Sequence, residues 1–364
     1  MRKIIFPVFT FIIIVIFWVI SQYDGITPQQ NPNQNETKLS ITEPEIFQQE
    51  PISLIFFGDI MLARSIQTHQ KSRPQNWPFN GIQDLISESN LAMGNLESPI
   101  GDESITCEDC YRFSIQQDEA TILKTVDFDL MTIANNHAND FADSPTKTKT
   151  TLENLGINAV GYISEGNTSQ QPVIKEVDSY TIGFLSYSSL TNTNFDHIAE
   201  ATEENIQSDI LALKNTVDLI IVNIHWGNEY TYQVTAEQKN LAHVAVDAGA
   251  DVIIGHHAHW MQPVEQYQHS LIFYGLGNTV FNMMYSMPTR QGFAVRAVIN
   301  RNDQTLGFEL IPMLIEDYAR PRILEPDESE YIEIEKILTD ISPTVSFKEL
   351  SVSTDLPEKK EPTL

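Results

Sequence analysis

The chain has 364 residues, and its 49 acidic against 22 basic residues give a formal net charge of −27. A surface this negative argues against the basic patches that nucleic acids and anionic lipids attract, so we expect no nucleic-acid partner. The length suits one large α/β domain that carries an N-terminal anchor and a C-terminal tail.

The N-terminal segment is typical of a membrane anchor. Residues 4–20 are apolar at all but two positions and follow Arg2 and Lys3. This run is just long enough to cross a bilayer, and the basic residues are expected to stay in the cytoplasm. A cleaved signal peptide is the alternative, but no small-x-small cleavage site follows. We therefore predict a retained single-pass helix within residues 1–22, which places the rest of the chain on the extracytoplasmic side of the cell membrane.

A polar spacer separates the predicted anchor from the folded domain. Residues 23–51 are rich in Gln, Asn, Pro and Thr and have no apolar period, as expected of a flexible linker. The folded domain is predicted over residues 52–349. The last segment, 350–364, is rich in Pro, Glu and Lys and is predicted to be a disordered tail.

Strand and helix patterns alternate along the domain and then give way to strands. The alternation predicts an α/β layered fold, and the later strands predict an antiparallel portion or a second sheet. Strands are expected at 52–58, 130–134, 157–161, 181–187, 219–224 and 252–254, and then at 271–274, 292–300 and 306–315. Helices are expected at 81–89, 145–155, 203–214 and 236–248, with a last amphipathic helix at 328–338.

Polar side chains follow several of these apolar strands. Asp59, His225 and the pair His257 and His259 each come at the end of such a run. In an extended backbone, residues two apart point the same way, so these two histidines are expected to face one point while His256 faces elsewhere. Strand ends at the carboxyl edge of an α/β sheet border a crevice. The pattern therefore predicts a metal centre at that edge.

Two further polar segments extend the candidate ligand set. Glu97 and Asn95 are two residues apart, so both point to one side if the backbone is extended, although a polar loop is the alternative. Asn136 and His137 cap an apolar strand, where Asn offers a carbonyl oxygen and His a ligand or a proton. Mixed imidazole, carboxylate and amide ligands suit Mn, Fe or Zn rather than Ca. The number of ligands suffices for one divalent ion or for two that share a carboxylate.

Four more residues near these motifs invite an interpretation. Arg64 and Glu229 are candidates for substrate binding, Arg64 as a clamp on phosphate or carboxylate, and a structural salt bridge is the alternative for both. Cys107 and Cys110 form a lone C-x-x-C. Outside the cytoplasm, a structural disulfide is favoured over a redox role.

The order of the motifs resembles the CapA family, also called PgsA-type proteins, of capsule and poly-γ-glutamate biosynthesis, which is similar to the calcineurin-like metallophosphoesterases. The resemblance covers residues 52–346. The motifs that carry it are Gly58 to Leu62, Asn95 to Ile100, Ala134 to His137, His225 to Tyr230, Gly249 to His259 and Tyr274 to Asn278.

The resemblance implies a four-layer α/β/β/α sandwich with the metals at one edge of its paired sheets. Asp59 would match the first aspartate of the phosphoesterase pattern and take part in catalysis, and Glu97 would replace the bridging carboxylate. His137 would protonate the leaving group. The remaining metal ligands would be Asn136, His225, His257 and His259.

This chain departs from the pattern of those families in three places. Met61 stands where phosphoesterases usually have a histidine, so one metal site lacks a ligand. Glu97 is longer than the usual aspartate, and this is expected to alter the distance between the metals. Ala258 stands where many CapA relatives have proline, and this change is expected to be harmless.

Three functions follow from this pattern. The first is a membrane-anchored, metal-dependent hydrolase that cleaves a phosphoester in a cell-envelope polymer or a lipid-linked precursor. The second is an accessory protein of an anionic extracellular polymer, which binds the polymer through its metals without hydrolysis and works beside a membrane polymer synthase complex. The third is a structural protein with a degenerate, metal-free site.

Overall fold

The computed structural model describes residues 50–347, apart from 103, 107–110, 168, 193, 301, 303 and 304, and the backbone of 351–355. The predicted anchor, most of the predicted linker, and both cysteines lie outside the described residues. Within the described part, no helix has the length and apolar character that crossing a membrane requires.

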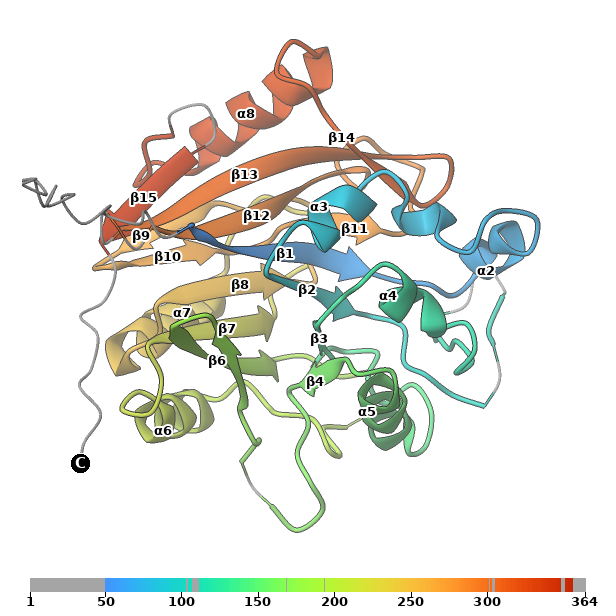
Figure 1. Cartoon of the computed structure of the whole chain (residues 1–364), viewed down its shortest axis with the longest axis horizontal. Coiled ribbons are helices and arrows are strands. Elements are labelled where there is room, and N and C mark those ends of the chain that lie inside the picture. Colours follow the sequence, from blue (N-terminus) through green and yellow to red (C-terminus); the bar gives the residue numbers. More distant parts are fainter. Residues whose placement is uncertain are drawn as a thin grey trace, which may run out of the picture. The chain divides into compact units, whose positions relative to one another are not determined.

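The first sheet is mixed and contains the N-terminal strand of the domain. In the described residues its order is β14-β13-β12-β1-β2-β3-β4, with β11 beside β1. Strand β1 runs parallel to β2 and antiparallel to β12, so it joins the parallel and antiparallel halves of the sheet (Figure 1). The strands are β1 (Ile52–Ile60), β2 (Leu91–Leu96), β3 (Leu130–Thr132), β4 (Asn158–Val160), β11 (Asn278–Val280), β12 (Gln291–Asn300), β13 (Thr305–Glu316) and β14 (Arg320–Ile323).

The second sheet has a parallel centre and antiparallel edges. Its order is β5-β6-β7-β8-β10-β9, in which β6, β7, β8 and β10 are parallel neighbours. Strands β5 and β9 pair antiparallel at the two edges. The strands are β5 (Val173–Val177), β6 (Tyr180–Ser188), β7 (Leu219–His225), β8 (Val252–His256), β9 (Val264–Tyr267) and β10 (Ser270–Phe273).

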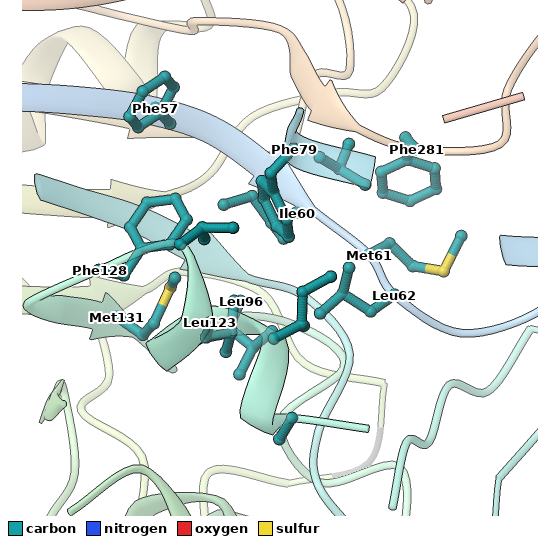
Figure 2. Close-up of a cluster of buried hydrophobic side chains, with 14 of the residues drawn as sticks. Phe57, Ile60, Met61, Leu62, Phe79, Leu96, Leu123, Phe128, Met131 and Phe281 are labelled. Carbon is teal, nitrogen blue, oxygen red and sulfur yellow. The ribbon is translucent and has the colours of Figure 1, made fainter. Parts of the chain in front are cut away.

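Hydrophobic clusters hold the sheets together and attach helices to their outer faces. Phe56 belongs to the cluster between the sheets, together with Phe184 and Phe273 of the second sheet. Phe57, its neighbour along β1, points the other way and packs with Phe128 under the short helices of the first sheet (Figure 2). This alternation is the period of a strand that is buried on both faces. The predicted α/β fold with paired sheets is confirmed.

Each sheet carries its own helices. The first sheet has α2 (Ser65–Gln70), the 3-10 helix η1 (Trp77–Phe79), α3 (Gln83–Ser87), α4 (Thr121–Thr125) and α5 (Ser144–Asn154). Helices α6 (Glu203–Leu213) and α7 (Ala236–Ala248) contribute to the cluster on the outer face of the second sheet. Helix α8 (Ser329–Ile341) packs beside β13 through Ile334 and Leu338. Helix α7 keeps its predicted bounds because Thr235 and Gln238 form a capping box at its start and Gly249 ends it with φ 121°.

The C-terminal segment differs from the prediction of a disordered tail. Residues Ser351–Asp355 form strand β15, which pairs antiparallel with β13 over residues 305–309. Strand β14 pairs only with residues 313–316 of β13. The first half of β13 would therefore be an open edge, and β15 supplies backbone partners to it. The remaining part of the predicted tail, 356–364, lies outside the described residues.

Candidate metal centre

The carboxyl ends of strands from both sheets carry polar side chains to one place. In the first sheet Asp59 is in register with Asn95 on β2 and with Asn278 on β11. In the second sheet His225 is in register with His256 on the neighbouring strand. The Asp59 carboxylate accepts hydrogen bonds from the Asn95 amide at 2.8 Å and from the backbone N–H of His257 at 3.2 Å. The bond from His257 links the ends of the two sheets.

Asp59, Glu97 and His259 form the first of two ligand groups. One candidate ligand atom from each lies within 4.8 Å of the others, and all three residues are buried. The Nδ1 atom of His259 is 2.9 Å from the Asn278 Oδ1 atom. This partner fixes the ring and leaves Nε2, 3.8 Å from a Glu97 oxygen, as the ligand atom. Metal-binding histidines in proteins are usually held in this way.

The surroundings of the Glu97 carboxylate show whether this group suits a cation. Both of its carboxylate oxygens are buried, and neither has a hydrogen-bond partner among the described residues. Burial, reinforced by the neighbouring Asp59 charge, raises the pKa of the Glu97 carboxyl well above its usual range. A buried carboxylate without partners is costly unless a cation lies beside it. The donor set therefore fits a divalent metal.

Asn136, His225 and His257 form the second group. The Nε2 atom of His225 lies 2.8 Å from the Asn136 Oδ1 atom and 3.1 Å from the His257 Nδ1 atom. Ligands bound about 2.1 Å from a common ion would lie about 3.0 to 3.4 Å from one another, so this spacing suits shared coordination. The first and second groups contain all six residues predicted as metal ligands.

Burial and neighbouring charges set opposite protonation preferences in the two groups. Burial, with a smaller contribution from His257, lowers the pKa of His225 well below its usual range. Burial also lowers the pKa of His257 to about 3, so both rings are neutral, as metal ligands must be. For His259 burial is outweighed by Glu97 and Asp59, which raise its pKa to about 9. For Asp59 burial is outweighed by His256 and His259, which hold the pKa of the carboxyl well below its usual range.

The predicted extended path through the histidine motif is wrong. Strand β8 ends at His256, and His257 and His259 adopt φ angles of 92° and 55°. Their rings therefore diverge, with centroids 6.1 Å apart, and each joins a different ligand group. His256, expected to face elsewhere, lies with Nδ1 3.4 Å from a carboxylate oxygen of Asp59. No sequence signal marks this role, because it depends on His256 lying opposite His225 on the neighbouring strand.

Met61 stands at the position where phosphoesterases usually have a histidine ligand. Its side chain is fully buried in the hydrophobic cluster with Ile60, Leu62 and Phe281 (Figure 2). Asp59, Glu97 and His259 thus form the first group without a contribution from this position.

His137 is held at the edge of the two groups by a residue that sequence reasoning did not single out. Its Nδ1 atom is 2.9 Å from an Asp140 oxygen, and its ring stacks on Phe113 with centroids 4.0 Å apart. The same Asp140 oxygen accepts the Phe113 backbone N–H at 2.7 Å. The Nε2 atom of His137 is 3.8 Å from a Glu97 oxygen. In the sequence, Asp140 follows His137 by three residues within one polar run, and this spacing was the available signal for their contact.

A cavity of about 800 Å³ opens over the centre, and we call it the first cavity. Asn136, His137 and His259 line it, and so do Arg64 and Glu229, the two predicted substrate-binding residues. Arg64 has a φ of 60° and stacks its guanidinium on Phe113, 4.4 Å from the ring centroid. Strained backbone of this kind concentrates at functional sites. The first cavity therefore combines both groups with a charged wall.

A sequence profile described as "Bacterial capsule synthesis protein PGA_cap" matches residues 53–283. The chain is 28% identical over 313 residues to "PGA biosynthesis protein CapA" of Bacillus subtilis, covering 83% of this chain and 81% of the relative. It is 26% identical to "Capsule biosynthesis protein CapA" of Bacillus anthracis over 293 residues, covering 74% of this chain and 68% of the relative. A crystal structure titled as a novel phosphatase of Mycoplasma pneumoniae has a TM-score of 0.48 and 14% identity, and the match covers 78% of this chain and 97% of that one.

Proposed function

The chain belongs to the bacterial capsule synthesis protein PGA_cap family, and from this premise we propose that it is a metal-dependent phosphoesterase of capsule or poly-γ-glutamate biosynthesis or export. The observation that carries the proposal is Glu97, a buried carboxylate without hydrogen-bond partners between His137 and His259. A metal centre would explain this group, because a bound cation would neutralise the buried carboxylate.

The proposed fold type is the four-layer sandwich of the calcineurin-like metallophosphoesterases, and the proposed cofactor is one or two ions of Mn, Fe or Zn. Asp59, Glu97 and His259 would hold one ion. Asn136, His225 and His257, with Glu97 shared, would hold the second. Bound divalent ions lower the pKa of water and neutralise charge on a phosphoryl group, and this is the chemistry they would supply here.

The side chains around the ions have their own roles in the proposal. Arg64 would hold a phosphate oxygen, because a guanidinium offers donors in a fork that matches it. His137 would give the proton from Nε2 to the leaving oxygen, while Asp140 fixes Nδ1 and so the orientation of the ring. Glu229, on the wall of the first cavity, would contact the rest of the substrate.

The direct test uses the purified full-length chain with 4-nitrophenyl phosphate and bis(4-nitrophenyl) phosphate. We expect turnover that disappears on chelation and returns with Mn, Fe or Zn. For a phosphate ester of an alcohol, whose leaving oxygen needs a proton, we expect turnover to fall by about 100-fold or more in His137→Ala. A His269→Ala variant is the matched control, because that histidine lies outside both ligand groups and outside the lining of the first cavity. Full activity of His137→Ala on the alcohol ester, or activity that survives complete removal of metal, contradicts the proposal.

The variant Asp140→Asn tests whether Asp140 positions His137 for proton transfer or only maintains the local structure. Without the carboxylate, His137 should be a poor proton donor, so phosphate esters of alcohols should lose far more kcat than esters of 4-nitrophenol. The latter leaves readily without a proton. An equal loss for both kinds of ester would mean that Asp140 only maintains the local structure.

We further propose that the domain works on the extracytoplasmic side of the cell membrane, anchored by a helix within residues 1–22. The support is the apolar run over residues 4–20 that follows two basic residues. Protease added to intact cells should cut a tag at the C-terminus, whereas a tag at the N-terminus should be protected. The reverse result contradicts the orientation.

A non-hydrolytic accessory protein is the second candidate, and Met61 favours it. Because this residue is packed in the core, the first ligand group lacks a side chain that would complete it. A protein of this kind would bind anionic polymer through its metals beside a membrane polymer synthase. Stoichiometric metal, binding of poly-γ-glutamate and no turnover of any phosphoester would identify it.

A further inference from the structure

A second cavity of about 690 Å³ lies beside the first, and its lining shares Arg112 and Asp140 with it. Volumes of this size are typical of ligand pockets. None of the six predicted metal ligands lines the second cavity. Its other lining residues come from three segments, residues 139–145, 163–167 and 194–197. The second cavity is therefore a separate space that adjoins the first at Arg112 and Asp140.

The walls of the second cavity are tied to each other and to the metal centre. The side-chain amide of Asn139 donates to the backbone carbonyls of Asn194 at 3.2 Å and Asp196 at 3.0 Å. The backbone N–H of Asn192 donates to the carbonyl of Asn136 at 3.2 Å. The loop that carries Asn192 and Asn194 thus connects the second cavity to a candidate metal ligand.

Arg112 marks the junction between the cavities, and its guanidinium is already engaged. It donates to the backbone carbonyl of Asp140 through Nε at 2.7 Å and also through Nη2, and it lies 4.2 Å from the ring centroid of Phe141. These contacts hold the side chain in place as a wall. They also compete with any anionic group that would use the guanidinium as its partner.

The charges of the second cavity disfavour an anionic occupant. Four carboxylate residues line it, Asp140, Asp143, Glu165 and Asp196, against the single guanidinium of Arg112. The one histidine in the lining, His197, is bonded through Nδ1 to the carbonyl of Ile163 at 2.9 Å. Like charges placed together across an interface are strongly unfavourable. A chain with a carboxylate on every unit would be repelled here.

The same lining suits hydroxyl groups. Carboxylate and amide oxygens accept hydrogen bonds from hydroxyls, and amide N–H groups donate to them. The half-buried rings of Phe141 and Phe195 add apolar surface between the polar groups. The lining is thus mainly polar with some apolar surface, a composition that suits a hydroxyl-rich ligand.

Resting on the proposed phosphoesterase function, we propose that the substrate is a phosphate-bearing glycan. Its phosphate binds at the metal centre, and a hydroxyl-rich body without negative charge occupies the second cavity. The negative charge of the substrate is then concentrated in the phosphate, where the cations and Arg64 meet it. A polyglutamate chain does not have this distribution of charge.

The test compares two series of phosphate monoesters with the full-length, metal-loaded chain. One series is maltose-type oligosaccharides of one to four glucose units with a terminal phosphate, and the other is oligoglutamates of the same lengths that end in phosphoserine. We expect kcat/KM to rise by about tenfold along the glycan series and to stay flat or fall along the glutamate series. A rise along the glutamate series, or no dependence on length in either, overturns the proposal.

Charge reversal in the second cavity sharpens the comparison. The double variant Glu165→Lys with Asp196→Lys should raise kcat/KM for the glutamate substrate of four units. The difference in kcat/KM between the glycan and glutamate substrates should therefore become smaller. The matched control is Glu204→Lys with Glu237→Lys, which changes the net charge equally on α6 and α7, away from both cavities. The control should leave the difference in kcat/KM between the two substrates unchanged. An equal narrowing in both double variants would mean that the overall charge, and not the second cavity, selects the substrate.

Binding measurements distinguish this proposal from the proposed function itself. Calorimetry with unphosphorylated maltotetraose should show binding that Ala142→Trp abolishes by filling the second cavity, and tetraglutamate should not bind there. If no phosphoester is turned over but maltotetraose binds in this way, the hydrolase proposal fails and the glycan site stands. If 4-nitrophenyl phosphate is turned over but maltotetraose does not bind, only the glycan proposal fails.

Discussion

Asp59 and Glu97 bring two carboxylates into a site almost closed to solvent, and two buried like charges are costly unless cations neutralise them. In the metal-free chain His259, with a pKa raised to about 9 against the penalty of burial, supplies one positive charge. A divalent ion supplies more charge at the same place and displaces the proton. Metal binding and proton release are therefore linked at this centre.

Glu97→Gln tests whether the buried carboxylate exists for a cation. We expect the metal-free variant to be about as stable as the metal-free native chain. A neutral amide removes a buried charge without hydrogen-bond partners, a cost of about 1 to 3 kcal/mol, but it also removes the attraction to the protonated His259 ring 3.8 Å away. In saturating Mn the variant should lack most of the rise in Tm that the native chain shows. Thermal unfolding with and without metal measures both.

Glu309→Gln is the control, since that carboxylate pairs with Arg296 on a half-exposed strand surface far along the sheet. It should leave the metal-induced rise in Tm intact. A large loss of metal-free stability in Glu97→Gln would show that Glu97 is held by the protein alone.

The pH dependence of metal affinity follows from His259. Below pH 9 its ring is protonated in the metal-free chain, so an ion must displace a proton and its affinity is reduced. We expect the apparent affinity for Mn to rise with pH from about 6 to 9 and then to level off. Calorimetry at pH 7.5 in buffers of different ionisation enthalpy should show proton release, and uptake of protons would contradict a raised pKa of His259.

The residue types of the centre were accessible to sequence reasoning, and their orientations were not. Asp59 and His225 end apolar strands, which is enough to place them at a sheet edge. The rings of His257 and His259 point apart because both residues have positive φ angles. Such angles are uncommon for residues other than glycine, so the sequence does not predict them at these positions. His256 and Asp140 were missed because their roles depend on neighbours on other strands and loops.

Gly255 shows how closely the strand that carries these histidines fits its surroundings. A Cβ atom at this position would lie 2.0 Å from the carbonyl oxygen of Tyr274 and 2.7 Å from the Trp226 indole nitrogen. That nitrogen donates to the same carbonyl at 2.9 Å. A side chain at Gly255 would push β8 away from this hydrogen bond and move the histidines that follow it.

Gly255→Ala should therefore destabilise the fold by about 1 to 3 kcal/mol and weaken metal binding, because overpacking shifts backbone that cannot yield. Gly307→Ala on β13 is the control, because its Cβ would have no neighbour closer than 3.9 Å. Urea unfolding and metal titration of both variants measure the effects. Equal, small changes in the two would mean that the fit at Gly255 does not position the centre.

Elements with their own periodic pattern were predicted well, whereas elements defined by partners were not. Helix α7 has an apolar stripe and a capping box, and its predicted bounds match. Strand β2 is buried throughout, has no alternation and was not among the predicted strands, and its end at Asn95 was open to interpretation as a polar loop. The three-residue strand β11 and the terminal strand β15 exist through pairing with β1 and β13, which local sequence does not encode.

The whole molecule opposes the approach of the substrate that we propose for it. With a formal charge of −27, the chain repels a phosphate ester at long range, while Arg64 and Arg112 act only at short range, in the lining of the cavities. The Debye length shortens from about 30 Å at 0.01 M salt to about 8 Å at 0.15 M, so salt screens the distant charges first. Moderate salt should therefore help this protein to meet its substrate.

We expect kcat/KM for 4-nitrophenyl phosphate to rise by about threefold between 0.01 M and 0.15 M NaCl at constant metal occupancy. Bis(4-nitrophenyl) phosphate carries about one negative charge less, so its kcat/KM should rise less steeply, and this pair of substrates is its own control. Steady-state kinetics with the metal content measured at each salt concentration provides the test. A fall with salt for both esters would mean that the arginines and the bound cations, and not the net charge, govern the approach to the site.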